Sequence, residues 1–318
     1  MARMEGMEGT GVVATRDELV GLAKLVGATR STQGRRVATP RVGSHVSRFH
    51  GPGMDFAETR EYQHGDDIRA IDWRITARTG RAHTKLFEAE RERPAWFLAD
   101  LGPSMRFATR GVLKSVAAAR ATSLLAWQAH REGEPIGGIV RSSGHAFEES
   151  AGRSRRHLMR LIDALAKGTE VSPDADAKTS LSDELEWVRG RARSGSRVIV
   201  VSDFYGLESG AENEAYKIMC SLVRRCELTL VWVYDRMEAK APPPGRYRVS
   251  DGEHCETLVS RRSHDWRQRY HQDFDRRGSM LNQLVHSFGA KLLPLRTDEP
   301  TASVLDPMHA RASALEMN

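Results

Sequence analysis

The sequence has little cysteine and no long apolar run. Its 318 residues contain three cysteines, Cys220, Cys226 and Cys255, which form neither a CxxC pair nor an even-numbered set. This argues against a disulfide framework and indicates buried or incidental thiols in a reducing compartment. No apolar run approaches the roughly 20 residues that span a bilayer, and the N-terminus lacks the apolar stretch of a signal peptide. We therefore expect a soluble, cytoplasmic protein.

Acidic residues are absent over a long N-terminal stretch. No aspartate or glutamate lies between Glu18 and Asp55, although residues 24–48 carry six lysines and arginines. The whole chain has a net charge of +6. Such a basic segment can bind nucleic acid or anionic lipid, or it can be a solvated surface. We favour the solvated surface because the sequence contains no recognised nucleic-acid-binding motif.

Two short apolar runs, each followed directly by an aspartate, organise the rest of the chain. Residues 95–99 (AWFLA) precede Asp100, and residues 196–202 (SRVIVVS) precede Asp203. Short apolar runs bounded by turn residues are typical of strands buried on both faces of a parallel sheet. A helical pattern begins at Gly111, and strand, loop and helix in succession are the opening of an α/β domain.

The remaining segments complete the predicted fold. Their apolar periodicity and turn residues predict the order β-α-β-β-α-α-β-α-β-hairpin-α-β, which is a doubly wound, mainly parallel α/β sheet. The helix that begins near Gly111 is expected to bury its leucines and alanines and to expose Lys114 to water. The chain then divides into a disordered N-terminus (1–15), an accessory helix and polar β/loop segment (16–93), the α/β domain (94–300) and a C-terminal tail (301–318).

The aspartates that end the two strands are candidate ligands of a metal ion. Parallel strands end at the same edge of a sheet, so Asp100 and Asp203 are expected to lie close together there, with Ser104 nearby. Carboxylate and hydroxyl oxygens suit a hard divalent cation. The alternative is that each aspartate only caps the helix that follows it. Thr179 is expected to cap the next predicted helix, Leu181 to Arg191.

Residues 55–85 form the most polar segment. The alternation of Ile71, Trp73 and Ile75 with polar residues predicts a strand, and Gly65 marks a turn before it. Charges of both signs alternate along the segment, which favours interlocking arginine–carboxylate pairs that hold an irregular structure. The competing hypothesis is a metal-dependent hydrolase whose carboxylates come from this segment, namely Asp66, Asp67 and Asp72.

The same segment carries a family resemblance. The pattern RxYxxGDDxRxIDWxxxARTG, from Arg60 to Gly80, resembles the signature of the DUF58 proteins, and the later ERERP and VSDF sequences fit it as well. The resemblance covers roughly residues 16 to 300. It implies a von Willebrand factor A-like fold, a MoxR-type AAA+ ATPase as partner, and an adaptor or assembly role. The structural signature residues that it implies are Arg60, Tyr62, Gly65, Asp66, Asp67, Arg69, Asp72, Trp73 and Arg78.

The resemblance also implies a degenerate metal-ion-dependent adhesion site. Asp100 and Ser104 match the aspartate and second serine of its Asp-x-Ser-x-Ser motif, while Gly102 replaces the first serine. Thr179 and Asp203 match the threonine and the later aspartate. These residues would hold a weakly bound Mg²⁺ at most. Many DUF58 proteins begin with membrane helices, and their absence here implies a soluble member.

Three functions remain open on the sequence alone. We favour a non-catalytic, protein-binding adaptor or assembly factor that acts with a MoxR-type ATPase. No nucleophile–base pair supports an enzyme, and no glycine-rich phosphate loop supports an NTPase. The alternatives are the metal-dependent hydrolase of the polar segment and a nucleic-acid-binding protein that uses residues 24–48.

Overall fold

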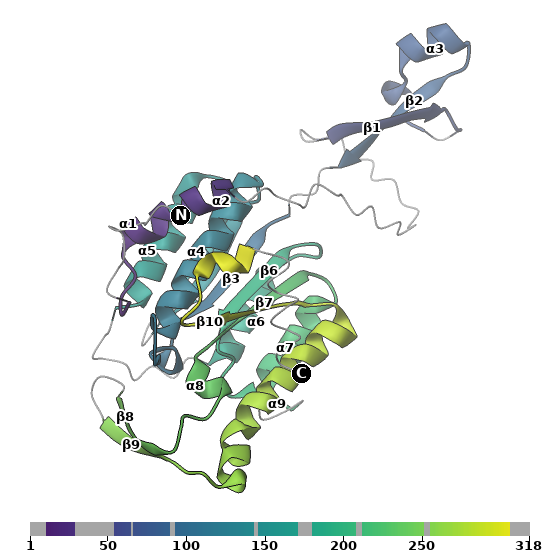
Figure 1. Cartoon of the computed structure of the whole chain (residues 1–318). Coiled ribbons are helices and arrows are strands. Elements are labelled where there is room, and N and C mark those ends of the chain that lie inside the picture. The colour runs from purple at the N-terminus through teal and green to yellow at the C-terminus, as the bar shows by residue number, and fades with distance from the viewer. Residues whose placement is uncertain are drawn as a thin grey trace. The chain divides into compact units, whose positions relative to one another are not determined.

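The computed structural model describes most of the chain, in two compact units. The described residues are 11–28, 54–64, 66–89, 93–142, 146–170, 180–207, 212–250 and 255–305. Residues 1–10 of the N-terminus expected to be disordered, the tail beyond 305, Gly65 and Thr179 lie outside them. The expectation of disorder is wrong for the rest of 1–15, because Ala14 is 1% exposed and its backbone N–H donates to Thr169 Oγ1 (3.0 Å). The larger unit comprises residues 1–30 and 93–318, and the smaller one residues 31–92. Figure 1 shows both, and each is described separately below.

The larger unit is built on a six-stranded sheet. Its strand order is β10-β7-β6-β3-β4-β5, and every neighbouring pair is parallel except β4 and β5. This confirms the predicted doubly wound, mainly parallel α/β fold. The strands are β3 (Ala95–Asp100), β4 (Ile136–Arg141), β5 (Ala146–Gly152), β6 (Arg197–Ser202), β7 (Glu227–Tyr234) and β10 (Lys291–Arg296).

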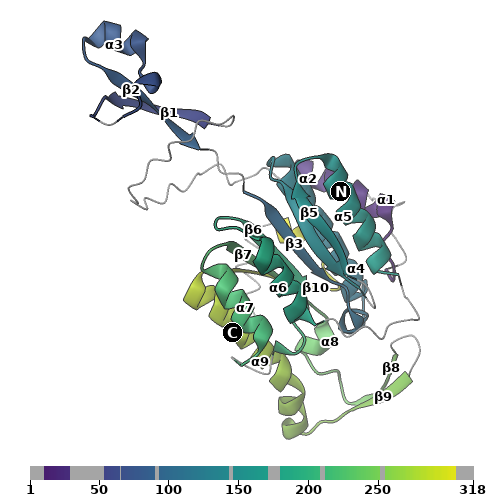
Figure 2. The same ribbon diagram turned by 180° about the vertical axis from the view of Figure 1, so that it is seen from behind.

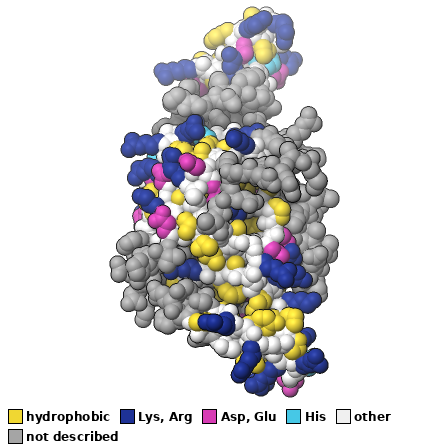
Figure 3. Space-filling view, turned by 60° about the vertical axis from the view of Figure 1, so that its left-hand side comes forward, with side chains coloured by type: hydrophobic (Ala, Val, Ile, Leu, Met, Phe, Trp, Pro, Cys, Tyr) yellow, Lys and Arg dark blue, Asp and Glu magenta, His cyan; other side chains and the backbone are white. Residues whose placement is uncertain are grey.

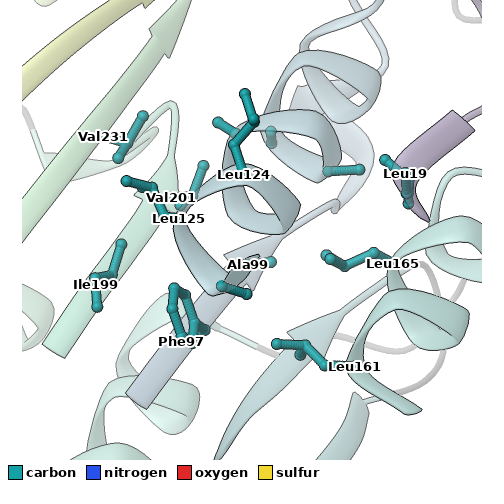
Figure 4. Packing of buried hydrophobic residues seen from close by; sticks show 14 of the residues in the cluster. Leu19, Phe97, Ala99, Leu124, Leu125, Leu161, Leu165, Ile199, Val201 and Val231 are labelled. Atoms are coloured by element: carbon teal, nitrogen blue, oxygen red, sulfur yellow. The ribbon is translucent and has the colours of Figure 1, made fainter. Parts of the chain in front are cut away.

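Helices cover both faces of this sheet, as the two opposite views in Figures 1 and 2 show. One face carries α1 (Arg16–Gly21), α2 (Ala23–Ala28), α4 (Lys114–Arg131) and α5 (Arg155–Gly168). The other carries α6 (Leu181–Arg191), α7 (Glu214–Val223) and α9 (His264–Phe288). Successive residues of β3 enter different cores, because side chains alternate along a strand. Phe97 packs under α4 and α5 (Figure 4), whereas Leu98 packs on the opposite face.

The order of the strands fixes where a site can form. Counted along the chain within this sheet, the spatial order is 3-2-1-4-5-6, so it reverses between β3 and β6. Open α/β sheets bind ligands outside the carboxyl ends of their strands at such a reversal, since the connecting loops diverge there. Asp100 ends β3 at this point, and Asp203 directly follows β6.

Chain segments at both ends of the described sequence belong to the larger unit. Leu19 of α1 is fully buried, and its carbonyl accepts hydrogen bonds from Ser123 Oγ (2.9 Å) and Trp127 Nε1 (3.2 Å) of α4. The helix that we grouped with the accessory segment therefore packs on the α/β domain instead. Val304, in a short 3₁₀ helix (η4, Thr301–Leu305) at the start of the expected tail, is also buried.

The connection between β7 and β10 follows the predicted order. It contains a short helix, α8 (Arg236–Ala239), and an antiparallel hairpin of β8 (Gly245–Ser250) and β9 (Cys255–Ser260) before α9 begins. Gly289 ends α9 in the left-handed conformation (φ 79°), which glycine adopts without a side-chain penalty. Within the described residues, every helix is too short or too polar to cross a bilayer.

The smaller unit differs from the prediction. Its two antiparallel strands are β1 (Met54–Glu61) and β2 (His83–Ala89), whereas the expected strand at residues 71–75 is largely a helix, α3 (Trp73–Thr79). A 3₁₀ helix, η1 (Ile68–Ala70), precedes it. Asp72 starts α3 by accepting the backbone N–H groups of Arg74 (3.0 Å) and Ile75 (3.2 Å). Local capping therefore outweighs the alternation of apolar and polar residues.

Substituting two glycines tests how closely β3 and β4 pack in the sheet. A Cβ on Gly138 of β4 would lie 2.3 Å from the carbonyl oxygen of Phe97, whereas one on Gly190 of α6 would meet no atom within 4 Å. We expect Gly138→Ala to lower the free energy of unfolding by roughly 1–3 kcal/mol, because the strands must move apart. Gly190→Ala should leave it equal or raise it by up to about 1 kcal/mol, because alanine favours helix. Urea unfolding measures both, and equal effects would contradict this packing of β3 against β4.

Candidate functional site

The structure brings Asp100 and Asp203 to the same edge of the sheet. β3 and β6 pair in parallel with Ala99 opposite Val201, so the two strands end side by side. Asp100 is 2% exposed and Asp203 1% exposed. Two carboxylates buried this close repel each other unless cations or protons compensate them. The groups that surround each one therefore decide its state.

Asp100 is held by donors from three directions. Its Oδ2 accepts a hydrogen bond from Ser202 Oγ (2.7 Å), and its Oδ1 accepts one from the backbone N–H of Gly102 (3.0 Å). Arg141 Nη1, at the end of β4, lies 3.4 Å from the same Oδ1. Burial raises the pKa of Asp100; Arg141 opposes this shift, and the charge of Asp203 adds to it, with a net rise. Asp100 is thus the carboxyl of the pair that takes up a proton more readily.

Asp203 has a buried ammonium group as its main partner. Lys114 Nζ lies 2.8 Å from Asp203 Oδ2 and 2.8 Å from Oε1 of Glu238 on α8. Burial alone would raise the pKa of Asp203, but the charge and hydrogen bond of Lys114 outweigh it and lower the pKa. The pKa of Lys114 is raised, because the two carboxylates outweigh the effect of its burial. This pair is therefore ionised.

The burial of Lys114 corrects the expectation that it faces water. Its side chain is 1% exposed, although it opens α4 at the loop end of the sheet. A cation at the first position of a helix is unfavourable next to the positive end of the helix dipole. The first turn of α4 also contains no acidic residue. A lysine at the first position of a helix whose first turn has no acidic residue was therefore the sequence signal that Lys114 needs acidic partners from elsewhere in the chain.

A third buried carboxylate completes the cluster. Glu184 of α6 is 2% exposed, and neither of its carboxylate oxygens accepts a hydrogen bond from the described residues. Its closest cation is Arg141, whose Nε lies 3.7 Å from Oε1. Burial raises the pKa of Glu184 to about 7; Arg141 counteracts this, and the charge of Asp100 increases it. Arg141 therefore serves two carboxylates, and Glu184 is its more distant partner.

A third parallel strand also ends in an aspartate. Asp235 follows β7 and is fully buried. It accepts hydrogen bonds from the backbone N–H (2.9 Å) and Oγ1 (2.7 Å) of Thr109 and from Thr297 Oγ1 (2.7 Å), and it caps α8. Burial opposes ionisation, but these bonds lower the pKa of Asp235 overall. The sequence shows the signal for it, an apolar run closed by aspartate, although we did not single it out.

The predicted metal ligands are only partly brought together. Ser104 is half-buried in a 3₁₀ helix after β3 (η2, Pro103–Met105), and no hydrogen bond joins it to Asp100 or Asp203 among the described contacts. Thr179 lies outside the described residues, and the N-cap of α6 is Ser180 rather than Thr179. In the described part of the chain, no three His, Cys, Asp or Glu side chains are arranged to hold a metal.

The surroundings of Gly102 also disagree with a metal site. A Cβ at this position would lie 3.1 Å from Asp100 Oδ1 and 3.5 Å from Arg141 Cζ. A serine here, as in the adhesion-site motif, would crowd the Asp100 carboxylate and contact the guanidinium group. Arg141 and Lys114 thus supply positive charge where a divalent cation would supply it. Mg²⁺ does not fit this arrangement unless both cations leave. The capping alternative does not hold as predicted either: Asp100 and Asp203 accept backbone N–H groups in the turns after their strands, whereas the N-caps of η2 and α7 are Gly102 and Asn213.

A comparison with protein families found a match. A family model described as "Protein of unknown function DUF58" matches residues 58–279, which is more than half of the chain. The chain belongs to the DUF58 family. Uncharacterized proteins of Mycobacterium bovis and of two Mycobacterium tuberculosis strains are 26% identical to this DUF58 chain over 260 residues, covering 80% of it and 78% of their own length.

One solved structure gives a weaker likeness to this DUF58 protein. It is described as the crystal structure of the conserved hypothetical protein BatB from Bacteroides thetaiotaomicron. The likeness has a TM-score of 0.40 and 15% sequence identity, and it covers 70% of this chain and 99% of that one. The fold described above follows from the strand order of the DUF58 chain itself.

The acidic residues of the DUF58 signature have local structural roles. Asp66 pairs with Arg60 (2.8 Å) and accepts the backbone N–H of Gln63 (2.9 Å). Asp67 accepts the backbone N–H of Arg69 (2.9 Å) and so caps η1. Asp72 caps α3 and lies 3.6 Å from Lys85 Nζ. These contacts agree with the expected structural role better than with a shared catalytic centre.

The arginines of the signature segment do not all follow the expected pairing. Arg60 pairs with Asp66, and Arg81 pairs with Glu61 (2.9 Å). Arg69 and Arg78, in contrast, are exposed and make no ion pair within the described residues, and Trp73 is 68% exposed. The interlocking network is therefore smaller than the alternation of charges predicts. The Tyr62 backbone N–H donates to the carbonyl of Ala82 (2.8 Å), which joins the segment to the start of β2.

Removing the buried ammonium tests the charge balance. We expect Lys114→Met to lower the free energy of unfolding by roughly 3–5 kcal/mol, because Asp203 is left buried without its cation. Lys114→Met combined with Asp203→Asn should recover part of the loss, since the fully buried charge is gone and the carboxylate that still lacks Lys114, Glu238, is partly exposed. Mg²⁺ should leave the Tm of the wild type unchanged and raise that of Lys114→Met, in which two carboxylates have lost their cation. A rise in the wild-type Tm that Asp203→Asn abolishes would instead establish a metal site.

Glu184, the third buried carboxylate, should make the free energy of unfolding depend on pH. The folded-state pKa of Glu184, about 7, lies above its ordinary value of 4.5, so its contribution to stability is complete below pH 4.5 and is lost as the pH rises through 7. The loss amounts to up to about 3 kcal/mol. Glu184→Gln removes this loss. The free energy of unfolding of the variant, relative to that of wild type, should therefore be higher at pH 8 than at pH 5. Urea unfolding at both pH values measures this, and an equal difference at the two would contradict the assignment.

Proposed function

We propose that this DUF58 protein is a non-catalytic adaptor or assembly factor that binds a MoxR-type AAA+ ATPase. The observation that carries the proposal is the charge balance at the switch point of the sheet. There Lys114 joins Asp203 and Glu238, and Arg141 lies between Asp100 and Glu184. Carboxylates that are buried and occupied by the chain's own cations are poorly placed to meet a substrate, so partners are bound at the surface.

The two other functions have less support. A hydrolase centred on Asp66, Asp67 and Asp72 would need free carboxylates, but these cap helices or pair with Arg60 and Lys85. Nucleic-acid binding would depend on residues 24–48, of which 29–48 lie outside the described residues. The identity of the ATPase as partner rests on the family resemblance, and its client protein is left open.

A binding experiment tests the proposal. The purified chain is mixed with the purified MoxR-type ATPase of the same organism, with and without ATP, and the masses are measured by size-exclusion chromatography with light scattering. We expect a complex, and no ATP hydrolysis by this chain alone, because it lacks a phosphate-binding loop. Absence of a complex in every nucleotide state would contradict the proposal, as would turnover that a point substitution in this chain abolishes. Co-purifying nucleic acid, detected by absorbance, would favour the nucleic-acid alternative.

A further inference from the structure

The small unit exposes large apolar side chains for which its own fold gives no reason. Trp73 is 68% exposed and Ile68 is 65% exposed, the largest values with Tyr205 among large hydrophobic residues of the described chain. Both lie in the DUF58 signature segment, Trp73 at a specified position of the pattern and Ile68 at an unspecified one. An exposed tryptophan and an exposed aliphatic residue in one short segment are features of binding surfaces.

The orientation of α3 is set by its contacts with β2. Thr76 Oγ1 accepts the backbone N–H of His83 (3.1 Å), and Thr79 Oγ1 lies 3.2 Å from Nδ1 of the same histidine. Ile75 and Thr76 are half-buried, whereas Trp73, Arg74, Ala77 and Arg78 are exposed. Residues four apart share one face of a helix, so both pairs, 73 with 77 and 74 with 78, lie on the outer side.

This outer side carries positive charge without internal compensation. Arg69, Arg74 and Arg78 are exposed, and none of them forms an ion pair with a described residue. Three carboxylates of the unit pair with other cations: Glu61 with Arg81, Asp66 with Arg60, and Asp72 with Lys85. Asp67 accepts the backbone N–H of Arg69 and so caps η1.

The placement of these arginines is also unfavourable for the helix. Arg74 and Arg78 are like charges at helical spacing, and Arg74 lies in the first turn, where the helix dipole disfavours a cation. The local sequence thus carries a small folding cost that no ion pair among the described residues of the unit offsets.

We propose that Ile68, Arg69, Trp73, Arg74 and Arg78, together called the α3 face, dock on an acidic protein surface. Figure 3 shows Lys and Arg side chains gathered with hydrophobic ones on the small unit. Trp73 would anchor in an apolar pocket, and the arginines around it would pair with carboxylates of the partner. The inference rests on the proposed adaptor function and names the surface and the charge of its partner.

The composition of the face favours this occupant over two others. A second copy of the same face would bring like charges together, which disfavours a self-complementary contact. Nucleic acid could stack on Trp73 and pair with the arginines, but it would leave the exposed Ile68 without an apolar pocket, so it is less favoured. An acidic protein surface with an apolar pocket satisfies both the charge and the exposed hydrophobic groups.

The test compares variants of the α3 face with a matched control. The first is Trp73→Ala, and the second is Arg74→Glu with Arg78→Glu. The control is Arg246→Glu with Arg248→Glu, which makes the same change of charge at exposed positions of β8 in the larger unit. Their affinity for the purified MoxR-type ATPase is measured by calorimetry at two salt concentrations, after circular dichroism has shown that each variant is folded.

We expect the two α3-face variants to weaken binding by at least about tenfold and the control to change it by less than about threefold. Added salt should weaken the wild-type complex, because charges contribute to it. Hydrogen exchange should show new protection of residues 68–79 in the complex. A complex that forms equally well with all variants overturns the α3 face but leaves the adaptor function standing, whereas absence of any wild-type complex overturns the adaptor function itself.

Three other outcomes would also overturn the inference. One is equal weakening by the β8 control, which would show a non-specific effect of charge. Another is protection of residues 68–79 in the free chain, which would mean that the rest of the chain or a second copy covers the face. The third is competition for the α3 face by a single-stranded oligonucleotide that binds more tightly than the ATPase.

Discussion

The ammonium group of Lys114 is the interaction on which the carboxyl edge of the sheet depends. It joins the start of α4 to Asp203 after β6 and to Glu238 of α8, three elements that are far apart in the sequence. Because it keeps Asp203 ionised, the negative charge of the pair falls on Asp203, and Asp100 is the carboxyl whose pKa rises. Lys114 therefore keeps Asp203 ionised directly, whereas the pKa of Asp100 rises mainly because of its own burial, and the charge of Asp203 adds to that rise.

Burying such a group has a cost that the fold must offset. Taking an ammonium and a carboxylate out of water is unfavourable, and their attraction repays this only when the geometry is good and the remaining polar atoms are satisfied. Here Asp203 also accepts the backbone N–H of Tyr205 (3.0 Å), and Arg277 of α9 donates to the Asp203 carbonyl (3.1 Å). The pair thus fixes where α4, α8 and α9 meet the sheet more than it adds net stability.

The parts predicted well from sequence depend on local composition. Strands β3 and β6 are short apolar runs closed by turn residues, and this pattern is visible without knowing their neighbours. Lys114 was misplaced because a helical wheel assigns a lysine to water, while its partners lie 89 and 124 residues away along the chain. Arg141 and Glu184 were missed for the same reason. No local pattern tells which distant carboxylate a buried cation will meet.

The error at α3 has a different cause and shows where function can reside. Ile71, Trp73 and Ile75 alternate as in a strand, but Asp72 caps a helix and Gly80 ends it in the left-handed conformation (φ 72°). In a strand, these three side chains would share one face toward a core; in the helix, Ile75 packs inward while Trp73 points out. The two units therefore differ in how their charged groups are placed. At the sheet edge, buried carboxylates lie beside buried or half-buried cations of the same chain. In the small unit, Trp73 and the arginines of the α3 face are exposed.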